Sequence, residues 1–216
     1  GNDTLDGGDG NDTIDYGSEG GGSGVNVDLT AGTATDTNGD SDTLSNIEVV
    51  LGTANADTLV GSTVAETLSG GAGSDSISGG GGDDHLIGGD ADDTFEGGAG
   101  NDLIDAGSGD VVGDMVTYAN DTGAVNVNLA TDIATDGSGG TDTLNSIERA
   151  IGSAFNDTLT ADVSESNQLF GGGGNDSITG GAGSETLNGD AGNDTITGNA
   201  GNDSLAGSDG NDSLVG

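Results

Sequence analysis

The sequence predicts an all-β fold in which short strands stack into a solenoid, and three observations lead to this prediction. A nine-residue unit recurs along the 216-residue chain, and its eighth position holds a large apolar residue. The triplet at positions seven to nine reads polar–apolar–polar, the pattern of a short strand with one inward side chain. The six residues before each triplet are rich in glycine and end on an acid, which indicates a turn. The eighth positions are Leu5, Ile14, Leu59, Leu68, Ile77, Leu86, Phe95, Ile104, Leu159, Ile178, Leu187, Ile196, Leu205 and Leu214.

Stacking of these units would bring their acids into columns. We expect two nonapeptides to form one coil, so that each turn lies about 4.8 Å from the turn two units later. Every second sixth-position acid then shares an edge of the solenoid. The expected columns are Asp57, Asp75 and Asp93 opposite Glu66, Asp84 and Asp102, and then Asp157, Asp176, Asp194 and Asp212 opposite Glu185 and Asp203.

A longer period divides the chain into two tandem copies. The segment 25–29 matches 125–129, and 42–48 matches 142–148, both at an offset of 100 residues. Alternating Val25, Val27 and Leu29 predict a half-buried strand inside an irregular insert. We therefore predict repeats over 1–15, an insert of widened coils over 16–51, a block of six nonapeptides over 52–105, a second insert over 106–151, and a last repeat block over 152–216.

Composition argues that the chain cannot fold unaided and excludes several partners. The net charge is −38, and Leu, Ile, Val and Phe together make up 41 of 216 residues, a combination typical of disorder. With one Lys or Arg in total, the chain cannot neutralise phosphates, so nucleic-acid binding is excluded. No apolar run is long enough to insert into a membrane. Folding therefore requires a cationic partner.

The segment contains few residues that are suited to catalysis. There is no Cys nucleophile, and the one His has no plausible Ser–His–Asp set around it. The glycine-rich turns lack the Gly-Lys-Ser/Thr of a phosphate-binding loop. We therefore predict that this segment is not an enzyme.

The residues of each turn are those that calcium binding requires. Calcium takes six to eight oxygen ligands from carboxylates and backbone carbonyls, in irregular geometry. Glycines at positions one, two and four would allow positive φ and turn carbonyl groups toward one point. The sixth-position acid would supply charged oxygens, and a cation between stacked turns could be shared by both. We therefore expect calcium ions to be the partner.

The unit Gly-Gly-x-Gly-x-Asp-x-U-x, where U is large and apolar, resembles the repeat of the RTX (haemolysin-type) calcium-binding family over about three-fifths of the chain. The resemblance implies a right-handed parallel β-roll, a β-solenoid, with rows of calcium along both edges. It also implies type I secretion of an unfolded chain that folds in the calcium outside the cell. A strongly negative chain fits that route, since self-repulsion keeps it extended.

Pairing neighbouring acids within the columns predicts roughly eight bound calcium ions. The candidate metal-binding residues are Asp12, Asp57, Gly71, Gly73, Asp75, Gly80, Gly82, Asp84, Asp93, Gly98, Gly100, Asp102, Asp157, Gly172, Gly174, Asp176, Glu185, Gly192, Asp194, Gly201, Asp203, Gly210 and Asp212.

Three turns depart from the repeat, and we expect their sites to be weak or absent. Turn 61–66 lacks two of the glycines, and turn 161–167 is one residue longer without an acid at the expected place. Glu185 replaces the usual Asp by a longer side chain.

The identity of the parent protein stays open at this stage. The chain opens on Gly1, inside a repeat, so we expect other domains of a larger protein around it. The segment could be the non-catalytic tail of a secreted protease, lipase or polysaccharide-modifying enzyme, or an extender or ligand-binding segment of an adhesin. Ice binding is disfavoured because position nine is irregular along the chain. A disordered acidic linker is also disfavoured, because disorder does not require an apolar residue at every eighth position.

Overall fold

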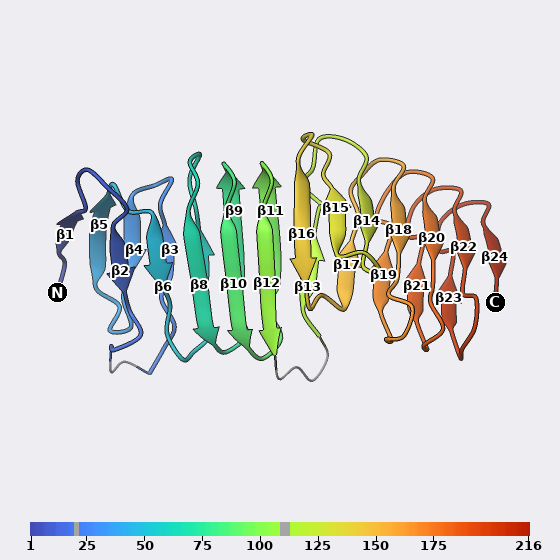
Figure 1. Cartoon of the computed structure of the whole chain (residues 1–216), viewed down its shortest axis with the longest axis horizontal. Coiled ribbons are helices and arrows are strands. Elements are labelled where there is room, and N and C mark those ends of the chain that lie inside the picture. The colour runs from blue at the N-terminus through green and yellow to red at the C-terminus, as the bar shows by residue number, and fades with distance from the viewer. Residues whose placement is uncertain (20–21, 109–112) are drawn as a thin grey trace. The chain divides into compact units, whose positions relative to one another are not determined.

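The computed structural model describes residues 1–19, 22–108 and 113–216 (Figure 1). The secondary structure of these residues consists of strands, and no helix among them has the length and hydropathy of a membrane span. The chain divides into two compact units, Gly1–Asp114 and Met115–Gly216, which are described separately. Parts of the two predicted inserts, residues 20–21 and 109–112, lie outside the described residues.

The first unit contains two sheets. Their hydrogen-bonded orders are β1-β5-β4-β3-β7-β9-β11 and β2-β6-β8-β10-β12. The strands are β1 Thr4–Asp6, β2 Thr13–Asp15, β3 Asn26–Asp28, β4 Thr33–Thr35, β5 Ser41–Ser45, β6 Val49–Leu51, β7 Thr58–Val60, β8 Thr67–Ala72, β9 Ser76–Gly81, β10 His85–Asp90, β11 Thr94–Ala99 and β12 Leu103–Ser108.

The second unit has the same arrangement of two sheets. Their orders are β13-β17-β19-β21-β23 and β16-β15-β14-β18-β20-β22-β24. The strands are β13 Met115–Thr117, β14 Asn126–Asn128, β15 Ile133–Thr135, β16 Thr141–Asn145, β17 Arg149–Ile151, β18 Thr158–Thr160, β19 Gln168–Phe170, β20 Ser177–Thr179, β21 Thr186–Asn188, β22 Thr195–Thr197, β23 Ser204–Ala206 and β24 Ser213–Val215.

Consecutive nonapeptides alternate between the two sheets of each unit. In Figure 1 the arrows of β8, β10 and β12 point the opposite way to those of β9 and β11. Within one sheet the strands of the nonapeptides are parallel and in register, with Leu68 beside Leu86 in the first unit and Ile178 beside Ile196 in the second. Each partner is two nonapeptides away, which confirms the predicted coil. Each unit is a parallel β-roll.

The core of each roll is built from the eighth-position side chains. Leu59, Leu68, Leu86 and Phe95 are fully buried, as the sequence predicts. Leu5 and Leu214, in β1 and β24, are 36% and 42% exposed because they lie in the outermost described coils. One apolar side chain per nonapeptide is a small core, so most of the remaining stability has to come from the backbone ladder and from the turns.

The inserts widen the roll in a way the sequence does not reveal. β4 pairs antiparallel with both β3 and β5, and β15 pairs antiparallel with both β14 and β16. Each predicted widened coil is therefore a three-stranded meander within one sheet. The second hairpin of each meander is closed by an aspartate: Asp36 Oδ1 accepts the N–H groups of Asn38 and Asp40 at 2.9 Å, and Asp136 has the same role.

Candidate calcium sites

The sixth-position acids form columns along the turns of both units. The backbone N–H of nine sixth-position residues donates to Oδ1 of the acid two turns later, at 2.6–3.1 Å. The columns expected from the sequence therefore exist as chains of hydrogen bonds, while their metal binding stays a prediction. The donor–acceptor pairs are Asp57–Asp75, Asp75–Asp93, Asp93–Asp114, Glu66–Asp84, Asp84–Asp102, Asp157–Asp176, Asp176–Asp194, Asp194–Asp212 and Glu185–Asp203.

The second carboxylate oxygen has a different environment. Oδ2 of Asp75, Asp84, Asp176 and Asp194 is buried and accepts no hydrogen bond from the residues that the structure describes. An ionised carboxylate that is removed from water in this way is costly unless a cation or a donor compensates it. These four oxygens are therefore the strongest indication of a missing positive charge.

The electrostatics of the columns agree with that conclusion. Burial raises the pKa of Asp75 and of Asp84 to about 7, and that of Asp176 to about 6. For Asp75, the N–H donated by Asp57 opposes the shift, and repulsion from the acids above and below adds to it. The charged form of each acid is thus disfavoured until a cation lies beside it.

Glu185 belongs to the same group in spite of its longer side chain. Both of its carboxylate oxygens are buried and accept no hydrogen bond from described residues. Burial, followed by the neighbouring Asp203, raises its pKa. The backbone N–H groups of Gly181 and Gly183 in its own turn oppose the shift, but neither makes a hydrogen bond of good geometry to the carboxylate.

The first glycine of the turn provides space for the carboxylate. A Cβ on Gly70 would lie 2.0 Å from Asp75 Oδ2, and a Cβ on Gly189 would lie 2.1 Å from Asp194 Oδ2. Neither glycine has positive φ. The expectation that position one needs positive φ is therefore wrong, and the requirement there is steric.

In most turns, positions two and four do have the left-handed backbone that the sequence predicts. Every glycine among the candidate metal-binding residues has a φ between 91° and 149°. Asp190, Asn199 and Ser208 replace glycine at position two and still have φ values of 65–69°. Asp and Asn tolerate this conformation better than most residues do.

Oxygen atoms from two stacked turns converge where a side chain would otherwise be. A Cβ on Gly79 would lie 2.4 Å from Asp84 Oδ2 and 2.7 Å from the carbonyl oxygen of Gly97, two turns away. Among the described residues, no three His, Cys, Asp or Glu side chains gather as a metal site. A cation would therefore combine one or two carboxylates with backbone carbonyls, which is a donor set of oxygens that suits calcium.

Comparison with known families agrees with this donor set. The family model described as RTX calcium-binding nonapeptide repeat (4 copies) matches residues 1–19, 51–84, 60–95, 78–110, 163–196 and 179–214, more than half of the chain. The chain belongs to the RTX calcium-binding nonapeptide-repeat family. It is a calcium-binding repeat module of the RTX type, and such modules are non-catalytic. No curated protein matches it.

Two further acids of the RTX columns escape a search for glycine-rich turns. Asp114, fully buried, continues the first column by accepting the N–H of Asp93 at 2.6 Å. Glu48 Oε2 accepts the N–H of Asp12 at 3.0 Å. Glu48 is a sixth residue if the nine-residue frame is continued back from Leu59, because Val50 then falls at position eight and is fully buried. Asp114 lies 21 residues after Asp93, outside that frame, and only the buried Val116 two residues later marks it as a column acid.

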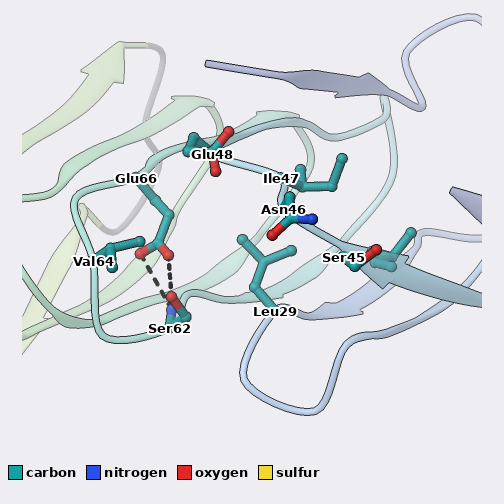
Figure 2. A pocket seen from close by; sticks show the side chains of 9 residues that line it. Leu29, Ser45, Asn46, Ile47, Glu48, Ser62, Val64 and Glu66 are labelled. Carbon is teal, nitrogen blue, oxygen red and sulfur yellow. Dashed lines mark hydrogen bonds between the residues drawn. The ribbon is translucent and has the colours of Figure 1, made fainter. Parts of the chain in front are cut away.

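Shortened turns interrupt the series of full-length RTX turns at equivalent places in the two units. Only residues 46–48 join β5 to β6, and only 146–148 join β16 to β17. Beside the first short turn is a cavity of about 270 Å³, lined by Leu29, Ile47 and Val64 among others (Figure 2). The second short turn borders a similar cavity of about 210 Å³. Each cavity marks a break in the stack of full-length turns.

Substitution of a first glycine in an RTX turn is expected to be far more damaging than substitution of a third. Gly171→Ala places a methyl group 2.2 Å from Asp176 Oδ2, whereas Gly173→Ala meets its nearest atom at 3.5 Å. Gly171→Ala should lower the free energy of unfolding in saturating calcium by about 1–3 kcal/mol, as overpacking does. Urea denaturation of both variants checks this, and equal stabilities would contradict the steric role.

Proposed function

We propose that the chain is a calcium-binding β-roll module of a larger secreted RTX-type protein and that it folds when it binds calcium outside the cell. The observation that carries the proposal is the set of buried Oδ2 atoms without partners at Asp75, Asp84, Asp176 and Asp194. Each is stacked on another acid, so the repulsion within a column has to be offset before the roll is stable.

The residues proposed to hold calcium are the column acids together with carbonyl groups of their own and neighbouring turns. When bound, calcium supplies two positive charges that offset the repulsion between stacked carboxylates. The acids are Asp12, Asp75, Asp84, Asp93, Asp102, Asp176, Glu185, Asp194, Asp203 and Asp212. Stacked pairs among these acids number about five, whereas the total of roughly eight ions expected from the sequence also counts pairs with Asp57, Glu66 and Asp157.

Secretion is supported by the family and by the charge of the chain. RTX repeat proteins are typically secreted, and a chain with a net charge of −38 repels itself when calcium is scarce. We therefore propose that the chain stays extended during export, by the type I route, and compacts in the calcium outside the cell.

Equilibrium dialysis of the chain against calcium tests the proposal directly. Several ions should bind per chain, with the bound number rising together with the β signal in far-ultraviolet circular dichroism. A chain that binds no calcium, or binds it without a change of structure, would overturn the proposal.

Magnesium at the same concentration is expected to fold the chain poorly. It requires a near-octahedral shell at about 2.0–2.1 Å and sheds water reluctantly. The turns instead offer backbone carbonyls and buried carboxylates in an irregular arrangement. The comparison is a circular dichroism titration with each ion. Equal folding by both ions would mean that the acids act only as a diffuse charge cloud.

A further inference from the structure

Four turns satisfy their sixth-position side chain internally. Thr53 N donates to Asp57 Oδ2 at 2.6 Å, and Ser153 N donates to Asp157 Oδ2 at 2.5 Å. Ser62 N donates to Glu66 Oε2 at 3.2 Å, and the Ser62 hydroxyl bonds the other carboxylate oxygen (Figure 2). We call 52–57, 61–66, 152–157 and 161–167 the self-closed turns.

The fourth self-closed turn shows that no charge is needed in this arrangement. Asp162 N donates to Asn167 Oδ1 at 2.8 Å, and the neutral Asn167 is buried where the other turns hold an acid. Its side-chain nitrogen donates to the carbonyl oxygen of Glu148 at 3.2 Å. Because the buried amide is neutral and both of its polar atoms are hydrogen-bonded, no cation is required to compensate it.

The backbone of the second residue separates the two kinds of turn. Where Asp75, Asp84 or Asp176 has an unbonded Oδ2, the second residue is a glycine with positive φ. In the self-closed turns the second residue is Thr53, Ser62, Ser153 or Asp162, none of which has positive φ. Its N–H then reaches the sixth-position side chain. Turn 180–185 belongs to neither kind, because Gly181 lacks positive φ and Glu185 is still unbonded.

The self-closed turns are consecutive in each unit, so each pair closes one complete coil. These self-closed coils, 52–69 and 152–170, lie directly beside the inserts, since β7 pairs with β3 and β18 pairs with β14. The insert also bonds the turn: Val25 N donates to Asp57 Oδ1 at 2.7 Å, and Val125 N donates to Asp157 Oδ1 at 2.8 Å. The same arrangement therefore occurs twice, once in each unit.

We propose that the self-closed turns bind no calcium and that each self-closed coil folds with its insert meander as a calcium-independent nucleus. The backbone conformation at position two then separates the turns that depend on calcium from the self-closed turns, with turn 180–185 outside both kinds. Asp57 and Asp157, which the sequence places among the metal-binding residues, serve as hydrogen-bond acceptors instead. The inference rests on the proposed calcium binding of the remaining turns.

Two neutralising substitutions in one column test which turns bind calcium. Glu66→Gln and Asp84→Asn each remove one charge, and the two acids are stacked neighbours, since Glu66 N donates to Asp84 Oδ1. Glu66→Gln should leave the number of calcium ions bound in equilibrium dialysis unchanged, because Gln still accepts from Ser62. Asp84→Asn should lower that number. An equal loss in both variants would overturn the inference.

Amide hydrogen exchange of the intact chain in excess chelator tests the nucleus. The amides of Thr53, Ser62, Ser153 and Asp162 should exchange more slowly than those of β9 to β11 and β20 to β22. Uniformly fast exchange without calcium would overturn the nucleus. Failure of the proposed function gives a different result, in which added calcium protects none of the amides of β9 to β11 and β20 to β22.

Discussion

With calcium removed by excess chelator, most of the chain is expected to lose its β structure. The coils beyond each self-closed coil bury acids whose second oxygen accepts no hydrogen bond from described residues, at Asp75, Asp84, Asp176 and Asp194. Their cores contain one large apolar side chain per nonapeptide. Burial of uncompensated charge costs several kcal/mol per ion, which so small a core cannot offset.

Far-ultraviolet circular dichroism through a calcium titration measures this effect. The transition should be cooperative, because each ion shared by stacked turns couples nearest neighbours in a linear array. A small residual β signal in chelator is expected from the self-closed coils. A full β spectrum in chelator would contradict the prediction.

Asp194→Asn is expected to have the largest effect of any single neutralisation. Asp194 Oδ1 accepts the N–H of Asp176 at 2.8 Å, and its own N–H donates to Asp212 Oδ1 at 3.0 Å. Its Oδ2 has no partner among described residues. The acid thus lies between two stacked turns, and the variant should bind about two fewer ions. The calcium midpoint for folding should rise with that loss.

The matched control for Asp194 is Asp209→Asn. Asp209 is exposed and lies outside the columns, so its neutralisation removes the same charge without touching a stacked acid. Dialysis should show the parent number of ions for Asp209→Asn. If the two variants lose calcium alike, the column acids act only through net charge.

The repeat made the core and the columns predictable from the sequence. In each nonapeptide the large apolar residue follows the acid by two positions, as Leu86 follows Asp84. One period therefore places an apolar side chain inward and an acid at the edge. Two units per coil then follow from strand spacing, and the register of Leu68 beside Leu86 agrees. The nine-residue pattern alone therefore predicts both the strands and the way in which they stack.

Features that break the period were harder to predict. The alternation Val25-x-Val27 indicates a strand without giving its direction, so the reversal at β4 was missed. Asp114 was missed because its turn lacks the glycine signature. The β-branched Thr53 disfavours positive φ, but its residue type does not reveal that its N–H bonds Asp57 Oδ2. Each of these features depends on backbone geometry that the repeat pattern does not specify.

Because consecutive strands alternate between the two sheets, odd and even repeats lie on different faces of the roll. Gain or loss of eighteen residues returns every later strand to its own sheet, whereas a change of nine exchanges the two faces and the two acid columns. A surface motif therefore has to be sought at every second repeat. For example, the outward residues of β18, β20 and β22 are all Ser or Thr. On the opposite sheet, β19 has Gln168 and Phe170 at the corresponding positions. One face can thus change independently of the other.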